Sequence, residues 1–265
     1  MCSSISRPAQ SQTGEASYPL VADLCQRLPR VAMPRRPRLQ APGATVHVVG
    51  RCNNREHRFS TPDDFRLLLA KLEEFCRAYG VVLYAYTLMA NHIHLLLQAP
   101  AGDPLGRPLR WLFREITRAW QRAHGGHGHF WERRYWACLI EDDCYALGAL
   151  RYLDRNPVRA SIVQDPADYS WSSCGACAVG RPNALIEFHP SYLALSRYPA
   201  VRRRLYRAML YPSDDPRADL RDPRWTMTRV LGSPGFLARF GVSPRLHLPP
   251  DAPSSQTSNP VPGTE

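Results

Sequence analysis

This chain of 265 residues contains two histidines that are separated by a single residue. Their spacing is the first sign of a chemically active site. They are His92 and His94, which lie in the largely apolar run from Tyr84 to Gln98. A short apolar run of this kind favours a central strand or a tight pair of strands, and residues two apart on a strand face the same side. The sequence therefore predicts two imidazoles side by side, with Ile93 turned into the core behind them.

Neighbouring imidazoles supply part of a divalent-metal site, because neutral imidazole is the commonest protein ligand for such metals. A metal that does chemistry also needs a third protein ligand and an open position. Two histidines on a strand are equally compatible with ordinary half-buried packing, so the pair alone leaves both interpretations open. The residues that favour the metal site lie further along the chain.

A tyrosine and an amide follow on a predicted helix. Tyr152 and Asn156 are four residues apart, which places them on one helical face, and Pro157 is expected to end the helix at Asn156. The flanking arginines are Arg151, Arg155 and Arg159. A phenol in this positive setting can act as a nucleophile where a metal and cations polarise a phosphate.

The charge balance indicates a nucleic-acid partner. The chain has 34 Lys and Arg residues against 23 Asp and Glu residues, a formal net charge of +11, and Lys71 is the only lysine. Arginine suits bidentate contacts to phosphate and base edges, and an excess of positive charge is typical of proteins that bind nucleic acid. GC-rich coding explains arginine in place of lysine, but it does not explain the net charge.

Three basic segments add to this interpretation. A proline-broken arm at residues 33–38 can follow a phosphate backbone. A helix expected over residues 109–124 carries an arginine at every fourth position, and residues 130–136 mix aromatic rings with arginines, as single-stranded nucleic acid requires. A solvated surface is the alternative for each segment. The arginines predicted to contact nucleic acid are Arg35, Arg36, Arg38, Arg51, Arg110, Arg114, Arg118, Arg133, Arg134, Arg151 and Arg155.

The remaining pattern predicts the elements that position these residues. Strands are expected at residues 45–51 and 137–140 from their β-branched and apolar composition. Between them, Ser60 or Thr61 caps a helix with Pro62 in its first turn, and Gly80 ends that helix. The two histidines thus fall on a strand that follows one long helix and precedes another.

These segments resemble, in their order and spacing, the single-tyrosine HUH transposases, and most closely the REP-associated tyrosine transposases. The resemblance covers about residues 33–180. Each segment alone is a weak signal, but their order and spacing together are specific. The matching segments are Met33–His47, Arg51–Arg55, Tyr86–His94, Trp131–Tyr135, Arg151–Ala160 and Tyr169–Ser173.

The resemblance implies a catalytic site. His92 and His94 would bind Mg²⁺ or Mn²⁺, and Tyr152 would be the nucleophile that cuts DNA. Asn156 occupies the position of the third metal ligand, where related transposases often have glutamine, and an amide oxygen suits a hard divalent ion. The implied reaction is transesterification of single-stranded hairpin DNA, which leaves a 5′-phosphotyrosyl link and a free 3′-OH and needs no ATP.

The expected fold is α+β and ferredoxin-like, an antiparallel sheet with helices packed on one face. The catalytic domain is expected at residues 33–180 and a small, mainly helical C-terminal region at 181–248, whereas residues 1–32 and 249–265 are expected to be disordered. The sequence shows no secretory signal and no apolar run of the roughly 20 residues that span a bilayer, which predicts a cytoplasmic protein. The choice between monomer and homodimer stays open.

Two other functions also stay open. A domesticated protein that binds DNA or RNA hairpins without catalysis would have no need of the set His92, His94, Tyr152 and Asn156. A metal-dependent phosphodiesterase that uses water would leave Tyr152 with a structural role, and covalent trapping would separate it from a transposase. The sequence identifies neither the DNA target nor the metal used in the cell.

Overall fold

The computed structural model describes residues 41, 43–98, 100, 105–141, 144–211 and 224–242. The extensions predicted at residues 1–32 and 249–265 lie outside this part of the chain. The basic arm with Arg35, Arg36 and Arg38 lies outside it as well. Among the described residues, no helix is both long enough and apolar enough to cross a membrane.

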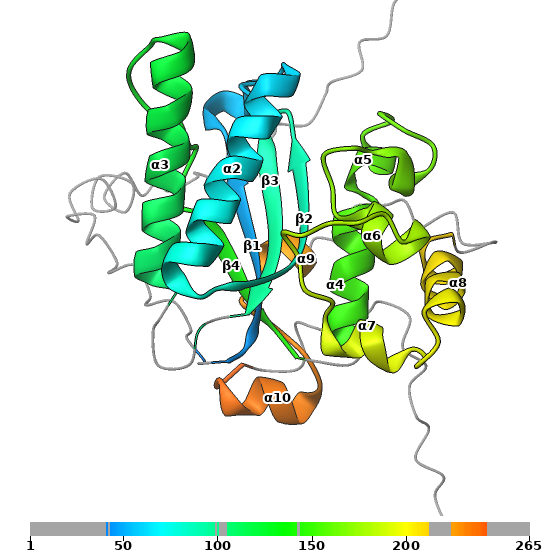
Figure 1. Cartoon of the computed structure of the whole chain (residues 1–265). Coiled ribbons are helices and arrows are strands. Elements are labelled where there is room, and N and C mark those ends of the chain that lie inside the picture. Colours follow the sequence, from blue (N-terminus) through cyan, green and yellow to red (C-terminus); the bar gives the residue numbers. More distant parts are fainter. Residues whose placement is uncertain are drawn as a thin grey trace, which may run out of the picture. The chain divides into compact units, whose positions relative to one another are not determined.

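A five-stranded sheet forms the centre of the fold, in the order β2-β3-β1-β4-β5 (Figure 1). The four strands β1 to β4 pair in antiparallel fashion, and β5 joins β4 in parallel. The apolar run around the histidines is therefore a pair of strands, β2 and β3, joined by a tight turn. The strands are β1 (Thr45–Arg51), β2 (Val82–Met89), β3 (His92–Gln98), β4 (Trp136–Ile140) and β5 (Val230–Leu231).

Helices α2 (Pro62–Tyr79) and α3 (Gly106–His124) cover one face of the sheet (Figure 1). As predicted, α2 begins with Thr61 as its cap and ends at Gly80, whose φ of 60° few residues other than glycine adopt. Asp64 completes the cap, because its carboxylate accepts from the Thr61 amide at 2.9 Å. Local sequence signals thus set both ends of this helix.

The opposite face is covered by α4 (Cys144–Asp154), the helix that carries the tyrosine. The α+β class is confirmed, but helices lie on both faces of the sheet rather than on one. The reason is visible in β3, where Leu95 and Leu97 pack on the side of α2 and α3 while Leu96 packs on the side of α4. A strand that is apolar on both faces needs a covering layer on each side.

Close packing between β1 and α3 depends on one glycine. A Cβ atom at Gly50 would lie 2.0 Å from the ring of Phe113. Any larger residue at this position would push the helix and the strand apart. The contact brings α3 close to the strand that borders the histidine strand.

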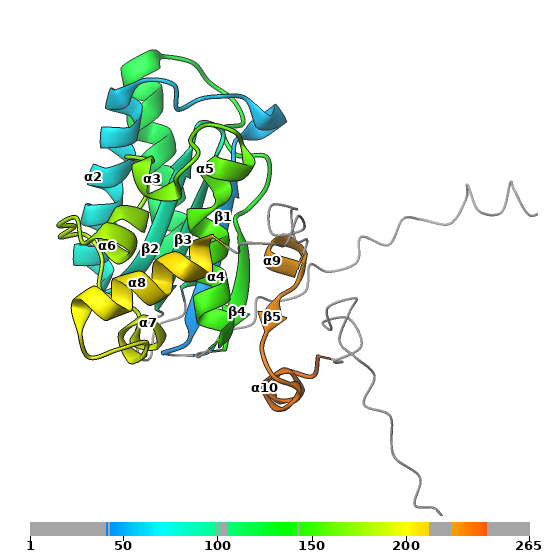
Figure 2. The ribbon, with the colours of Figure 1, turned by 90° about the vertical axis from the view of Figure 1, so that its right-hand side faces the viewer.

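The C-terminal region packs on α4 from the outside, as Figure 2 shows for α8. Tyr192, Tyr206 and Leu210 share a buried core with α4. The boundary predicted at residue 180, between the catalytic domain and the C-terminal region, stays a prediction. Within the C-terminal region, which was expected to be mainly helical, the structure also has the short strand β5 between two short helices. The remaining elements are η1 (Asn53–Arg55), α5 (Asn156–Arg159), η2 (Pro166–Asp168), α6 (Cys174–Val179), α7 (Pro190–Ala194), α8 (Pro199–Leu210), α9 (Arg224–Met227) and α10 (Pro234–Arg239).

Candidate active site

The two histidines lie side by side on the face of β3 that meets α4. The ring centroids of His92 and His94 are 4.9 Å apart, and the rings are nearly perpendicular. Ile93 points into the core on the opposite face and is fully buried, as the strand alternation predicted. His94 is buried and His92 is half-buried, so a ligand can approach the pair from the side of His92.

Tyr152, in the last turn of α4, packs against this pair. Its ring centroid lies 5.7 Å from that of His94. The guanidinium carbon of Arg159 lies 4.4 Å from the centre of the tyrosine ring, and Trp225 stacks on the ring at 5.6 Å. A buried phenol thus lies between an imidazole, a guanidinium and an indole.

The helix does not end at Asn156 as predicted. α4 ends at Asp154, and after one residue the short helix α5 begins at Asn156, with Pro157 in its first turn. The Arg155 amide still donates to the Arg151 carbonyl at 3.0 Å, so the helical path continues across the junction. Proline has no amide hydrogen to donate, and the first turn of a helix is where this loss costs least.

The side chain of Asn156 is oriented by the helix before it. Its amide nitrogen donates to the carbonyls of Tyr152 at 2.9 Å and Leu153 at 3.3 Å. Because the nitrogen is used in this way, the Oδ1 oxygen is the end of the amide available to a ligand. Asn156 therefore stays one helical turn from Tyr152, as the spacing predicted.

Burial keeps the inner histidines neutral. It lowers the pKa of the His94 ring well below its usual value, and nearby His92, His47, Arg159 and Arg51 lower it further. Burial also lowers the pKa of His47 to about 3. A neutral imidazole has a free lone pair, which is the form that binds a metal.

The donor set fits a hard divalent ion. No group of three His, Cys, Asp or Glu side chains suited to a metal occurs in the described part of the chain. A metal beside His92 and His94 would thus need an amide or solvent oxygen as well, and the Oδ1 atom of Asn156 can supply one. Two imidazole nitrogens and an amide oxygen are ligands that Mg²⁺ and Mn²⁺ accept.

Several of the predicted DNA-binding arginines lie near the histidine end of the sheet. Arg51 is opposite His92 in the pairing of β1 with β3. The Glu132 amide donates to the Arg51 carbonyl at 2.8 Å, which places the exposed Arg133 and Arg134 next to the same strand end. Of the arginines that were predicted to bind DNA, these three lie near the histidine strand.

Other predicted arginines lie elsewhere. Arg110, Arg114 and Arg118 are exposed on α3, which covers the face of the sheet opposite to α4 (Figure 1). Arg151 is half-buried on α4. Arg155 is buried and donates to the Leu210 carbonyl at the end of α8, so its position fits helix packing and does not fit the predicted contact with DNA.

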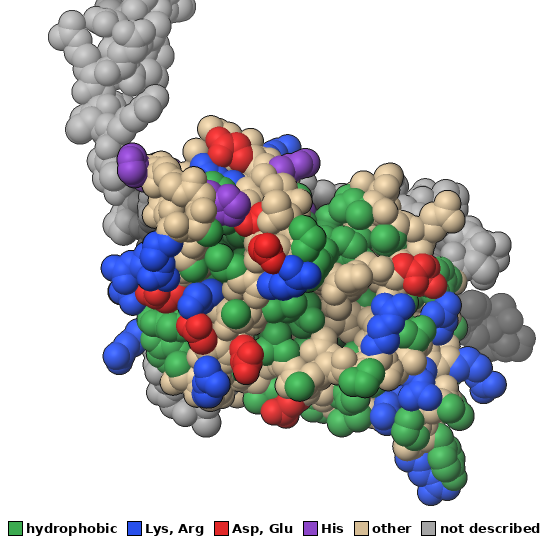
Figure 3. Space-filling model, turned by 45° about the horizontal axis from the view of Figure 1, so that its top comes forward, with side chains coloured by type: hydrophobic (Ala, Val, Ile, Leu, Met, Phe, Trp, Pro, Cys, Tyr) green, Lys and Arg blue, Asp and Glu red, His purple; other side chains and the backbone are tan. Residues whose placement is uncertain are grey.

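The surface charge is mixed rather than continuous. Figure 3 shows Lys and Arg side chains in several groups, with acidic side chains between them and histidines near the upper edge of this view. Acidic and basic side chains also lie close together on α3, where Glu115 lies 3.1 Å from Arg114 and 3.4 Å from Arg118. The net positive charge is therefore not gathered into one patch on this face.

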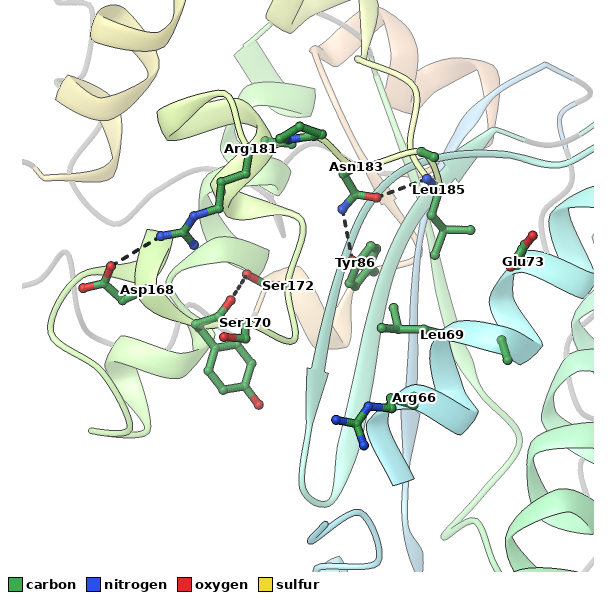
Figure 4. Close-up of a pocket in the computed structure, with 16 residues that line it drawn as sticks. Arg66, Leu69, Glu73, Tyr86, Asp168, Ser170, Ser172, Arg181, Asn183 and Leu185 are labelled. Carbon is green, nitrogen blue, oxygen red and sulfur yellow. Dashed lines mark hydrogen bonds and ion pairs between the residues drawn. The ribbon is translucent and has the colours of Figure 1, made fainter. Parts of the chain in front are cut away.

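A groove of about 910 Å³ lies between α2 and the segment 168–185 (Figure 4). Its polar groups are largely paired with one another. Asn183 donates to the Tyr86 hydroxyl at 3.0 Å, and Arg181 lies 3.8 Å from Asp168. The side chain of Tyr86 packs in the core on the α2 side of the sheet, so this groove is separate from the histidine pair.

Two neighbours of the site were missed by sequence reasoning, and a third was noted only as part of a positive neighbourhood. The missed residues are His47, whose ring stacks on His94 at 5.2 Å, and Trp225. Arg159 was recognised for its charge but not for its contact with the tyrosine ring. Strand alternation shows which residues of β1 share a face with His47. Only the pairing of β1 with β3 shows that His47 meets His94.

Comparison with known proteins shows what the region around this site is similar to. Residues 41–156 match the family model described as "Transposase IS200 like". The matched span includes both histidines and Tyr152, and it ends at Asn156. This region of the chain is therefore similar to an IS200-like transposase domain.

A known protein is similar to part of this chain. A protein from Haemophilus influenzae, assigned as a REP-associated tyrosine transposase, is 29% identical over 111 residues, which cover 38% of this chain. The chain spans 63% of the length of that relative. The resemblance to the single-tyrosine transposases, and to their REP-associated branch, is confirmed.

Two solved structures are also similar to this chain. One is a REP-associated tyrosine transposase bound to a REP hairpin; it is 19% identical with a TM-score of 0.48, and the match covers 60% of this chain and 93% of that one. The other is assigned as a transposase from Deinococcus radiodurans; it is 20% identical with a TM-score of 0.33, and the match covers 49% and 94%.

Proposed function

We propose that this protein nicks and rejoins single-stranded hairpin DNA, with Tyr152 as the nucleophile and a divalent metal held by His92, His94 and Asn156. The observation that carries the proposal is the contact between Tyr152 and His94, 5.7 Å between ring centroids, within a region similar to an IS200-like transposase domain. Asn156 follows one helical turn later with its amide oxygen available. Nucleophile and ligands thus come from three elements: the strand β3, the helix α4 that packs on it, and the short helix α5 that follows α4.

The reaction exchanges one phosphodiester bond for another. The phenol oxygen of Tyr152 attacks the scissile phosphorus and loses its proton, and the bond from phosphorus to the 3′-oxygen breaks as that oxygen gains a proton. A bound Mg²⁺ or Mn²⁺ would polarise the phosphate and offset its developing negative charge. Attack by a DNA 3′-OH on the phosphotyrosyl link reverses these steps and rejoins a strand, so no ATP is consumed.

Arg159 is suited to assist the nucleophile. Its guanidinium lies over the tyrosine ring and donates to the Tyr152 carbonyl, which fixes both groups relative to each other. A cation beside the phenol favours the phenolate that attacks, and it can also contact the phosphate that is attacked. We assign Arg159 this electrostatic role in the proposed reaction.

The choice of substrate rests on the family and on charge. The relative from Haemophilus influenzae is assigned as a REP-associated tyrosine transposase, and resemblance to that family implies a hairpin substrate. The net charge of +11 and the exposed Arg133 and Arg134 beside the histidine strand favour a polyanionic partner. We therefore propose a DNA hairpin with a single-stranded flank as the substrate.

Covalent trapping tests the proposal. Wild type, Tyr152→Phe and Tyr145→Phe would each be incubated with a labelled hairpin oligonucleotide and Mn²⁺, then separated on a denaturing protein gel. Tyr145 is the matched control, because it is another tyrosine of α4, seven residues before the nucleophile. We expect a labelled protein band from wild type and Tyr145→Phe and none from Tyr152→Phe.

Two other results would point to the remaining functions. DNA cleavage without any covalent band would contradict the tyrosine mechanism and indicate hydrolysis by water. Tight binding of several hairpins, with neither cleavage nor a covalent band, would indicate a binding protein that no longer catalyses the reaction.

A further inference from the structure

The outer histidine of the pair has a dedicated hydrogen-bond partner. The Nδ1 atom of His92 lies 2.6 Å from the Oδ1 atom of Asn91, the preceding residue in the turn between β2 and β3. The other end of this amide donates to the Arg55 carbonyl at 3.1 Å, which fixes the oxygen toward the imidazole. An amide oxygen only accepts, so this contact favours the tautomer of the His92 ring with its proton on Nδ1 and its lone pair on Nε2.

The turn that carries Asn91 is itself held in place. The amide of Cys52 donates to the Asn91 carbonyl at 2.8 Å, and the short helix η1 follows directly. Within η1, Asn54 and Arg55 adopt positive φ values of 51° and 57°. Non-glycine residues rarely adopt this conformation, and it is often found where surrounding structure fixes a functional group. Here the Arg55 carbonyl is the group that the bend presents to Asn91.

The inner histidine has a partner from a different strand. The Nε2 atom of His47 lies 3.0 Å from the Nδ1 atom of His94, and the two rings stack at 17°. His47 is on β1, two residues from Val49, which is directly opposite His94 in the strand pairing. Both rings are almost completely buried, at 0% and 1% exposure, so water cannot replace this contact easily.

Neighbouring rings fix the position of His47. The edge of Trp136, from the adjacent strand β4, contacts its ring with centroids 5.5 Å apart. On the side of α4, the ring of Tyr152 lies 5.9 Å away. His47 therefore has a defined place between the sheet and the tyrosine helix, and it is in contact with both components of the proposed reaction centre.

We infer that Asn91 and His47 are positioning residues that hold the rings of His92 and His94 with Nδ1 turned inward and Nε2 presented to a divalent metal. The inference deepens the proposed function and rests on it for the identity of the ligand. A metal-binding histidine commonly donates its second ring N–H to such a partner, which fixes the tautomer and the ring orientation. For His94 this means that Nδ1–H donates to the Nε2 atom of His47.

The tautomers can be measured in the protein alone. Long-range ¹H–¹⁵N correlation spectra of the metal-free and DNA-free protein distinguish a protonated ring nitrogen from one with a lone pair. We expect both His92 and His94 to carry their proton on Nδ1 in wild type. A His94 ring protonated on Nε2 in the wild-type protein would overturn the inference, because that nitrogen would then have no lone pair for a metal.

Paired substitutions separate positioning from packing. His47→Gln keeps a hydrogen-bond acceptor in the core, whereas His47→Leu fills similar space without one. We expect His47→Leu to weaken Mn²⁺ binding by about 10- to 100-fold and to lose the Nδ1–H bias at His94, while His47→Gln retains most of both. Asn91→Asp and Asn91→Leu form the same comparison at His92. Mn²⁺ affinity in His47→Leu equal to wild type, in a folded protein, would contradict the inference.

His189→Gln serves as the control for loss of a buried histidine. His189 is 1% exposed and hydrogen-bonds Thr45, away from the pair. We expect this variant to keep wild-type Mn²⁺ affinity, and a similar loss in it would show that any change in the core weakens metal binding.

Failure of the inference and failure of the proposed function give different results. Covalent trapping of DNA by a wild-type protein without the expected tautomers would overturn the inference and leave the function in place. The expected tautomers and Mn²⁺ binding without any covalent adduct would support the inference and remove the proposed function.

Discussion

The phenol of Tyr152 is largely buried, with only 6% of its surface exposed. Its neighbours divide the tasks that the proposed reaction requires. His94 lies on the side of the metal ligands, Arg159 brings positive charge, and Trp225 covers part of the ring. A phosphate that reaches the phenol oxygen would therefore enter a site where few water molecules compete for it and where charges act strongly.

The position of Arg159 supports a prediction about a single residue. If its guanidinium stabilises the attacking phenolate or the phosphate, Arg159→Ala should slow formation of the covalent adduct by about 100-fold, the usual effect of removing one such group. Arg159→Lys should recover part of this loss, because it restores charge without the planar fork. Hairpin affinity, measured without Mn²⁺, should change little in either variant. Equal adduct rates in wild type and Arg159→Ala would exclude a role in the chemical step.

Among the elements, the ends of the two long helices are joined by a buried carboxylate. Asp64, at the start of α2, accepts from Thr61 and also lies 2.6 Å from the Nε2 atom of His124 at the end of α3. Burial alone would raise the pKa of the Asp64 carboxyl, but hydrogen bonds from Thr61, His124 and Ser60 outweigh burial and hold the pKa below its usual value of 3.8. The charged form is thus the form that stabilises the helix pair.

The sign of this shift predicts a response to acid. A carboxyl whose folded pKa is lowered contributes stability above its unfolded pKa of about 3.9, and the contribution is lost as pH falls toward and through the folded pKa. Asp64→Ala should lower the free energy of unfolding at pH 7 by about 1 kcal/mol, the usual loss for a helix cap. It should also make stability less dependent on pH below about 4.

Urea titrations from pH 3 to pH 7 would measure this effect. Asp63→Ala is the matched control, because the neighbouring Asp63 side chain is 88% exposed and pairs with the exposed Arg66. We expect the control to stay close to wild type at every pH. A pH dependence in Asp64→Ala equal to that of wild type would show that the cap is not the source of the acid sensitivity.

At the scale of the whole molecule, two groups of arginines can be compared. One lies at the histidine end of the strands, with Arg51, Arg133 and Arg134, and the other lies on the exposed side of α3. The α3 arginines at positions 114 and 118 share a nearby acid, Glu115, which offsets part of their charge. The first group is also the one that adjoins the proposed reaction centre. We therefore expect it to contribute more to the binding of DNA.

Salt dependence tests this expectation. Removing an arginine that neutralises one DNA phosphate makes the plot of log binding constant against log salt concentration less steep by about 0.7 to 0.9. Arg133→Ala combined with Arg134→Ala should therefore reduce the slope by about 1.5 for a labelled hairpin. Arg114→Ala combined with Arg118→Ala removes the same charge from α3 and should change the slope less. A larger change in the α3 variant would place the DNA along α3.

The sequence by itself determined the features that depend on near neighbours along the chain. The cap at Thr61 and the stop at Gly80 follow from local backbone chemistry, and both are present as predicted. Strand alternation placed His92 and His94 on one side of the strand and Ile93 on the other. Helical spacing placed Tyr152 next to Asn156. Family resemblance added the roles of these residues, which stay proposals until the adduct is trapped.

Tertiary structure decided what depends on the pairing of distant segments. Spacing alone could not show that His47 meets His94, because that contact needs the register between β1 and β3. Nor could charge alone show that Arg155 is buried against α8 while Arg159 lies on the tyrosine ring. A side chain four residues along a helix is a neighbour by geometry, whereas one from another strand or helix becomes a neighbour only when hydrophobic burial fixes how the elements pack.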